Sequence, residues 1–142
     1  MNVTVRFPKH LQPDIEKAKV ATSLCQAASL YISLPDSIIV EFVDLGHSAY
    51  GESTLTFNKE SKVRINLQLS TKELIYPLVH ELLHLNQIHT GKLSVNRFGD
   101  CIWEGKTYKI DQSKLSYNDY KNLPWEQDVA DREKQLLVNI LQ

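Results

Sequence analysis

The sequence predicts an α+β fold, and three observations lead to this expectation. Short segments of alternating apolar residues, typical of strands, occupy much of the first half of the chain. A helical segment interrupts them, and two more helical segments follow. The chain has 142 residues, 42% hydrophobic and 23% charged, without repeats or Pro/Gly-rich linkers. We therefore expect residues 1–142 to form a single domain.

Most of the predicted strands have apolar residues at every second position, and one is predicted from its composition. Val3, Val5 and Phe7 alternate with polar residues and predict an opening strand that stops at Pro8. The residues that follow the first helix are rich in β-branched and aromatic types. Further strands are predicted at residues 38–43, 50–57 and 62–69, the last two as a hairpin, with a small hairpin over 103–110.

Three helices are predicted from three-to-four spacing of apolar residues. Ser70 and Glu73 have the spacing of a capping box and open the second helix, which Gly91 ends. Pro77 inside that helix predicts a bend or a later start. Pro124 is suited to the first turn of the third helix. The three predicted helices span residues 13–31, 70–89 and 124–141.

Charge and composition exclude several classes of protein. The 16 basic and 17 acidic residues are interspersed and give a net charge of −1, which disfavours nucleic-acid binding. No run of roughly twenty apolar residues and no signal segment is found, so we expect no membrane partner and a cytoplasmic location. Cys25 and Cys101 are far apart and predict neither a disulfide framework nor a thiolate zinc site. We expect a monomer.

The second helix contains the motif that indicates chemistry, HExxH at residues 80–84. His80 and His84 lie one turn apart on nearly the same side of a helix, so both imidazoles can reach one zinc ion. Glu81 lies beside them and is expected to act as the general base. The alternative is an ordinary amphipathic helix, but both histidines fall largely opposite its leucine-rich arc, which disfavours a role as core filler.

A catalytic zinc site usually has three protein ligands, so a third must be found. His89 falls on the apolar arc, roughly opposite His80, and is expected to be structural. The metzincin pattern is excluded because Gln87 and Thr90 occupy its glycine and third-histidine positions, and because the only methionine is Met1.

Glu126 in the last helix is the preferred third ligand. It projects into the apolar arc of that helix, where an ionised carboxylate is costly unless a cation meets it. Asp128 is expected on the solvated face and Asp131 at its edge, which makes both weaker candidates. Glu133 shares the apolar arc and is either a fallback ligand or an acceptor for a histidine N–H.

These residues resemble a known family. The pattern is similar to small metallopeptidases encoded by bacteriophages and prophages, within the zincin group that includes gluzincin-type and SprT-like minimal proteases. The resemblance implies a zincin-like domain with an N-terminal helix, a small twisted mixed sheet, the HExxH helix and a C-terminal helix that carries Glu126 as third ligand. It also implies a bacterial host cytoplasm. The matching residues are Ile65-Asn66, His80 to His84, Trp103-x-Gly105-x-x-Tyr108 and Leu123-Pro124-Trp125-Glu126.

The expected activity is that of a zinc-dependent metallopeptidase acting on a peptide or protein substrate. Zn²⁺ would lower the pKa of its bound water, and Glu81 would accept the proton. The oxyanion needs a further donor. Candidates for that donor are Tyr108 and Tyr120, with Tyr117 and Arg97 as further possibilities.

The substrate and two other functions stay open at this point. An extended peptide can pair with an exposed sheet edge, for which the strands at 50–57 and 62–69 are candidates. One alternative is a non-catalytic zincin-fold protein that binds a host or phage protein, although the presence of Glu81 argues against a purely structural site. The other is a protease acting on DNA-bound protein, which the near-neutral charge disfavours.

Overall fold

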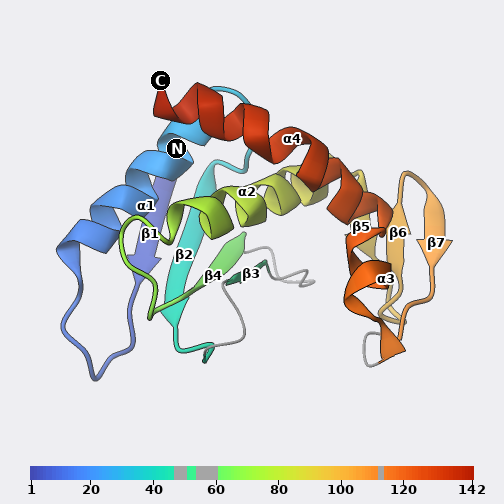
Figure 1. Cartoon of the computed structure of the whole chain (residues 1–142), viewed down its shortest axis with the longest axis horizontal. Helices are drawn as coiled ribbons and strands as arrows, with labels where there is room; N and C mark the ends of the chain where they lie inside the picture. The colour runs from blue at the N-terminus through green and yellow to red at the C-terminus, as the bar shows by residue number, and fades with distance from the viewer. Residues whose placement is uncertain (47–50, 54–60, 112–113) are drawn as a thin grey trace.

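The computed structural model describes residues 1–46, 51–53, 61–111 and 114–142. This part of the chain forms four helices and two small sheets, which confirms the α+β class (Figure 1). The helices are α1 (Ile15–Ala28), α2 (Ile75–His89), α3 (Tyr117–Lys121) and α4 (Pro124–Leu141). The strands are β1 (Asn2–Arg6), β2 (Ser37–Val43), β3 (Gly51–Ser53), β4 (Lys62–Asn66), β5 (Leu93–Val95), β6 (Cys101–Trp103) and β7 (Lys106–Tyr108).

The larger sheet has the strand order β1-β2-β4-β3. β1, β2 and β4 are parallel, and β3 is antiparallel to β4. Parallel neighbours need a crossover connection, which α1 supplies between β1 and β2. The strand positions were predicted, but the parallel pairing was not, because alternation identifies a strand without identifying its neighbour.

The predicted hairpin of residues 50–57 and 62–69 differs from the structure in extent. β4 ends at Asn66, whose side-chain oxygen accepts the Gln68 N–H at 3.1 Å and turns the chain. β4 also lies between β2 and β3, so residues 62–66 are not a sheet edge, contrary to expectation. β3 is an edge strand among the described residues. Positions 50 and 54–57 of the predicted partner strand lie outside the described residues.

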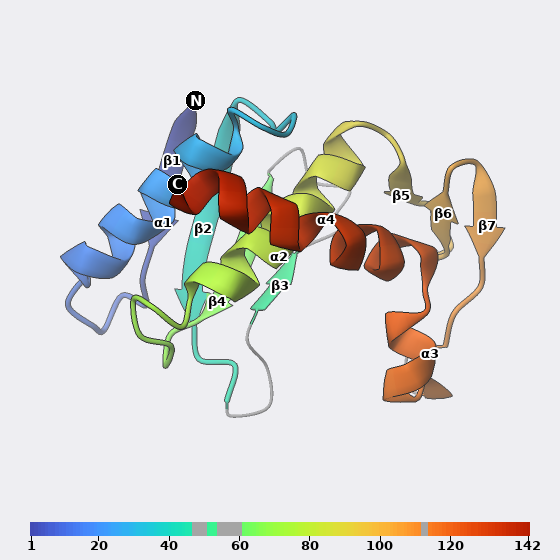
Figure 2. The same ribbon diagram turned by 45° about the horizontal axis from the view of Figure 1, so that its top comes forward.

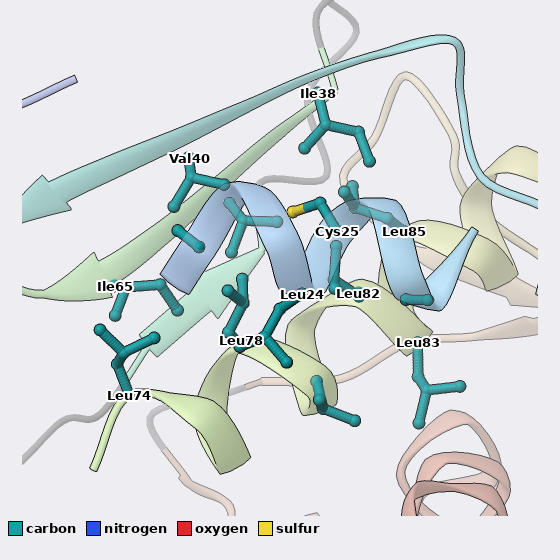
Figure 3. Packing of buried hydrophobic residues seen from close by; sticks show 14 of the residues in the cluster. Leu24, Cys25, Ile38, Val40, Ile65, Leu74, Leu78, Leu82, Leu83 and Leu85 are labelled. Carbon is teal, nitrogen blue, oxygen red and sulfur yellow. The ribbon is translucent and has the colours of Figure 1, made fainter. Parts of the chain in front are cut away.

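The core lies between the larger sheet and the helices, with α2 at its centre (Figure 3). The inward residues of β2 alternate with outward ones and pack against α1 and α2. α1 is shorter than the predicted helix because Asp14 caps its start and accepts the Lys17 N–H, while Leu30 and Tyr31 lie beyond its end and are exposed. Fully buried members of this core include Cys25, Val40, Phe42, Ile65, Leu78 and Leu82.

Pro77 was predicted to cause either a bend in the second helix or a later start, and the structure shows a later start. Ser70 and Glu73 make both hydrogen bonds of a capping box, at 3.0 and 3.1 Å, as predicted. The regular helix nevertheless begins at Ile75, so Pro77 falls in its first turn, where no N–H is needed. Gly91, with a φ of +80°, closes the other end as predicted.

α4 lies along α2, and both lead toward the smaller sheet and α3 (Figures 1 and 2). α4 has the predicted bounds. The predicted hairpin forms as β6 and β7, joined by Glu104 and Gly105, both with positive φ, but it ends at Tyr108 rather than at residue 110. β5 and α3 were not predicted. None of the helices in the described ranges has the length and apolarity needed to span a membrane.

Candidate metal centre

Three predicted residues come together where α2 packs against α4. His84 Nε2 lies 2.9 Å and His80 Nε2 lies 3.6 Å from Glu126 Oε1. One candidate ligand atom from each of the three residues lies within 4.8 Å of the other two. The histidines are adjacent because they are one helical turn apart, and their rings pack edge to face. Glu126 reaches them from the first turn of α4.

Glu126 is the least ordinary member of this cluster. Its side chain is about 5% exposed, and its neighbours Trp125 and Val129 are buried core residues. Oε1 accepts a hydrogen bond from the Tyr120 hydroxyl at 2.7 Å in addition to its contacts with the histidines. Oε2 is buried and has no hydrogen-bond partner among the residues that the structure describes. A buried carboxylate oxygen without a partner is costly, so a cation would satisfy a need that the protein itself leaves open.

The donor set fits zinc. Two imidazole nitrogens and one carboxylate oxygen are the ligand set of one group of catalytic zinc sites, which keep a further position for water. The unpartnered Glu126 Oε2 and the converging Nε2 atoms of His80 and His84 are therefore consistent with a bound Zn²⁺.

Without a metal, protons stabilise the same cluster. Burial lowers the pKa of His80, but hydrogen bonding to Glu126 and Glu133 outweighs it and raises the pKa to about 9. The pKa of His84 is also raised, because Glu126 outweighs the opposing effect of burial. Burial raises the pKa of Glu126, yet the two histidines hold it well below its usual range. An imidazolium-carboxylate cluster is therefore favoured when no other cation is present.

Each histidine uses its second ring nitrogen to contact an outer partner. His80 Nδ1 lies 3.0 Å from Glu133 Oε2, and His84 Nδ1 lies 2.9 Å from Gln87 Oε1. An acceptor at Nδ1 holds the imidazole orientation and directs Nε2 toward Glu126. Of the two roles predicted for Glu133, the structure places it in that of acceptor, on the far side of His80 from the cluster. Glu133 also accepts a hydrogen bond from the Tyr76 hydroxyl.

A polar network around Gln87 was not predicted. Gln87 is fully buried, and its Nε2 donates to the Trp125 carbonyl at 2.8 Å and to Asp128 at 2.9 Å. Arg132 donates to Asp128 at 2.8 Å and to the Asn86 side chain at 2.9 Å. The network joins α2 to the first turns of α4. In the sequence, Gln87 is an amide residue close to the apolar Leu85. That pattern is too weak to predict a contact with α4.

Two sequence-based placements need correction. Asp128 was expected on the solvated face, but it is half-buried because Gln87 and Arg132 donate to it. His89 was placed on the apolar arc, but it is exposed in the last turn of α2, beyond the region that α4 covers. Asp131 is exposed, which agrees with its rank as a weak candidate. A helical wheel assumes one buried side, whereas α2 is packed between the sheet, α1 and α4.

Glu81 is buried at 7% exposure, beside the cluster. Its negative charge is among the causes that raise the pKa of His80, His84 and Tyr120. The Glu81 carboxylate therefore lies close enough to both histidines to influence their charge. Its role as general base stays a prediction.

The candidate oxyanion donors differ in their placement. Tyr120 reaches the cluster through its hydrogen bond to Glu126. Burial and that hydrogen bond both raise the pKa of Tyr120, so its hydroxyl stays protonated. The Tyr108 ring instead packs edge to face on Trp125, 5.6 Å between centroids. Tyr117 is 79% exposed on α3, and the Arg97 guanidinium lies over the Phe98 ring.

Comparisons with protein-family models, with curated proteins and with solved structures found no match to this chain. The resemblance to phage-encoded zincins therefore stays a prediction.

Proposed function

We propose that this chain is a zinc-dependent metallopeptidase with a zincin-like fold. The observation that carries the proposal is the convergence of His80, His84 and Glu126, in which the buried Glu126 Oε2 lacks a partner. These three side chains would hold the ion. The arrangement of an HExxH helix over a sheet, with a second helix that delivers a carboxylate, supports the same proposal.

The bound ion would supply Lewis acidity, which lowers the pKa of water and polarises a carbonyl group. The Glu81 carboxylate accepts a proton from the attacking water and then gives it to the leaving amine. The Tyr120 hydroxyl, which donates its single proton to Glu126 Oε1 in this structure, would turn from Glu126 to donate to the carbonyl oxygen as negative charge develops there. Glu133 and Gln87 keep the two imidazoles oriented.

Metal content tests this proposal directly. We expect protein purified without added metal or chelator to contain close to one zinc per chain by elemental mass spectrometry. Glu126→Gln should lose most of this zinc because it removes the charge of the third ligand. Glu104→Gln, an exposed change of the same chemistry in the β6–β7 turn, should retain it.

Two results would contradict the proposal. Protein that contains no metal and takes up none during zinc titration would leave the HExxH motif without a metal function. Unchanged zinc in Glu126→Gln, combined with loss of zinc in Glu133→Gln or His89→Gln, would show that the third ligand is assigned wrongly.

A further inference from the structure

A cavity of about 380 Å³ lies between the smaller sheet, α3 and the start of α4. Its volume is within the range of roughly 300–1,000 Å³ typical of ligand pockets. Its walls are largely apolar, and none of the described residues that line it is charged. Gly99, Ser116, Tyr117 and Tyr120 are exposed, so part of the wall lies at the protein surface. The remaining wall is formed by Cys101, Ile110, Leu115, Leu123 and Trp125.

This cavity shares residues with the candidate metal centre. Tyr120 lines the cavity, and its hydroxyl donates to Glu126 Oε1. Trp125 also lines the cavity and immediately precedes Glu126, while its carbonyl accepts from Gln87, the partner of His84. A group that fills the cavity therefore lies one side chain away from the metal ligands.

We propose that this cavity binds a large apolar side chain of the peptide substrate, next to the bond that is cleaved. The inference rests on the proposed peptidase function and adds a substrate preference to it. An aromatic or leucine side chain would exchange water for the apolar wall, whereas a carboxylate would lose its hydration without gaining a cationic partner among the lining residues.

Cys101 provides a readout that does not depend on catalysis. Its side chain lines the cavity and is half-buried, whereas Cys25 is fully buried, and burial raises the pKa of the Cys25 thiol to about 12. A thiol reagent should therefore modify Cys101 first, and Cys101→Ser should remove that fast reaction. Occupation of the cavity should slow it.

The experiment uses the full-length Glu81→Gln chain, so that a bound peptide is not cleaved. Two capped peptides, acetyl-Ala-Ala-Phe-Ala-Ala-amide and the same peptide with Glu in place of Phe, are compared as protectants of Cys101. We expect the Phe peptide to slow modification at least threefold at saturation and the Glu peptide to leave the rate unchanged. In the unsubstituted chain, kcat/KM should be roughly 10- to 100-fold higher for the Phe peptide.

Two further variants test whether the effect arises in the cavity. Leu115→Trp should fill it and abolish protection. The matched change Leu30→Trp, at a side chain that is 79% exposed just after α1 and does not line the cavity, should not. Tyr117→Asp places a charge on the exposed part of the wall with little demand on folding and should also abolish the Phe preference.

The outcomes separate this inference from the peptidase proposal. Equal protection by both peptides, or none, would overturn the pocket, even if both peptides were hydrolysed. Protection by the Phe peptide alone, without hydrolysis by the unsubstituted chain, would support the apolar pocket and overturn the proposed activity. Unchanged selectivity in both Leu115→Trp and Tyr117→Asp would also overturn the pocket.

Discussion

At the residue scale, the candidate metal centre assigns different roles to two adjacent residues of α2, His80 as a ligand and Glu81 as a base. His80 faces Glu126, where ligand atoms converge, whereas Glu81 is buried beside them without belonging to the three-residue cluster. In the proposed function, Glu81 accepts and releases a proton and does not bind the ion. A substitution of Glu81 should therefore abolish activity while the protein still binds the metal.

We predict that Glu81→Gln keeps zinc at the level of the unsubstituted chain and loses peptide hydrolysis by roughly 10²- to 10⁴-fold, the usual contribution of a general base. The amide preserves the size of the side chain but cannot accept the proton. Zinc content and initial rates on the same preparation check this. A fully active Glu81→Gln would remove Glu81 from the role of base.

The outer acceptor Glu133 gives a second prediction at this scale. Glu133→Gln removes the charge that faces His80 Nδ1, so zinc affinity should fall by about 10- to 100-fold while activity persists at saturating zinc. Asp131→Asn, an exposed change in the same helix, is the matched control. Competition with a fluorescent chelator measures the zinc affinities. An equally large fall in zinc affinity in Asp131→Asn would show that the loss comes from the general negative charge of the helix and not from the contact with His80.

At the scale of elements, the ligand geometry depends on the packing of α2. This helix contacts the sheet and α1 through its leucines and α4 through the region of His84 and Gln87. Its position therefore sets the distance between the histidines and Glu126. The tertiary packing of such a helix supplies more of its stability than helix propensity does.

Leu82→Ala should lower the free energy of unfolding by about 2–5 kcal/mol, because Leu82 is fully buried in this core and the change leaves a cavity. Leu30→Ala, at a position 79% exposed, should change it by less than about 0.5 kcal/mol. Urea unfolding of both variants measures the difference. Equal stabilities would show that α2 is not anchored through Leu82.

At the scale of the whole molecule, protons and the proposed zinc ion would compete for the same cluster. Folding raises the pKa of His80 from 6.5 to about 9, so its contribution to the stability of the metal-free protein is full below pH 6.5 and is lost as pH rises through 9. The raised pKa of His84 acts in the same direction. Zinc binds deprotonated imidazoles, so its contribution grows over the same interval.

We therefore expect the Tm of chelator-treated protein to fall between pH 6.5 and 9, and the increase in Tm on zinc addition to become larger over that interval. Thermal unfolding at several pH values, with and without zinc, measures both trends. His80→Gln should flatten the metal-free trend, and His89→Gln, exposed at the end of α2, should leave it unchanged. A zinc-induced shift that is independent of pH would contradict the competition.

The sequence by itself determined the local features of this protein. The HExxH spacing places His80 and His84 together on any regular helix, and the unusual position of Glu126 in an apolar arc pointed to α4 as the source of a third side chain. Gly91 predicted where α2 ends, and Pro124 predicted where α4 begins. These features depend on residues within one or two turns of each other, so periodicity and caps are sufficient to predict them.

Only the tertiary structure decided which distant residues meet. The parallel order of β1, β2 and β4, the contacts of Gln87 with α4 and the cavity beside Tyr120 all join segments far apart in the chain. It also placed Glu133 beside Nδ1 of His80 and the Tyr120 hydroxyl beside Glu126. Such contacts depend on the way several elements pack at once, and the periodicity of any one segment does not contain that information.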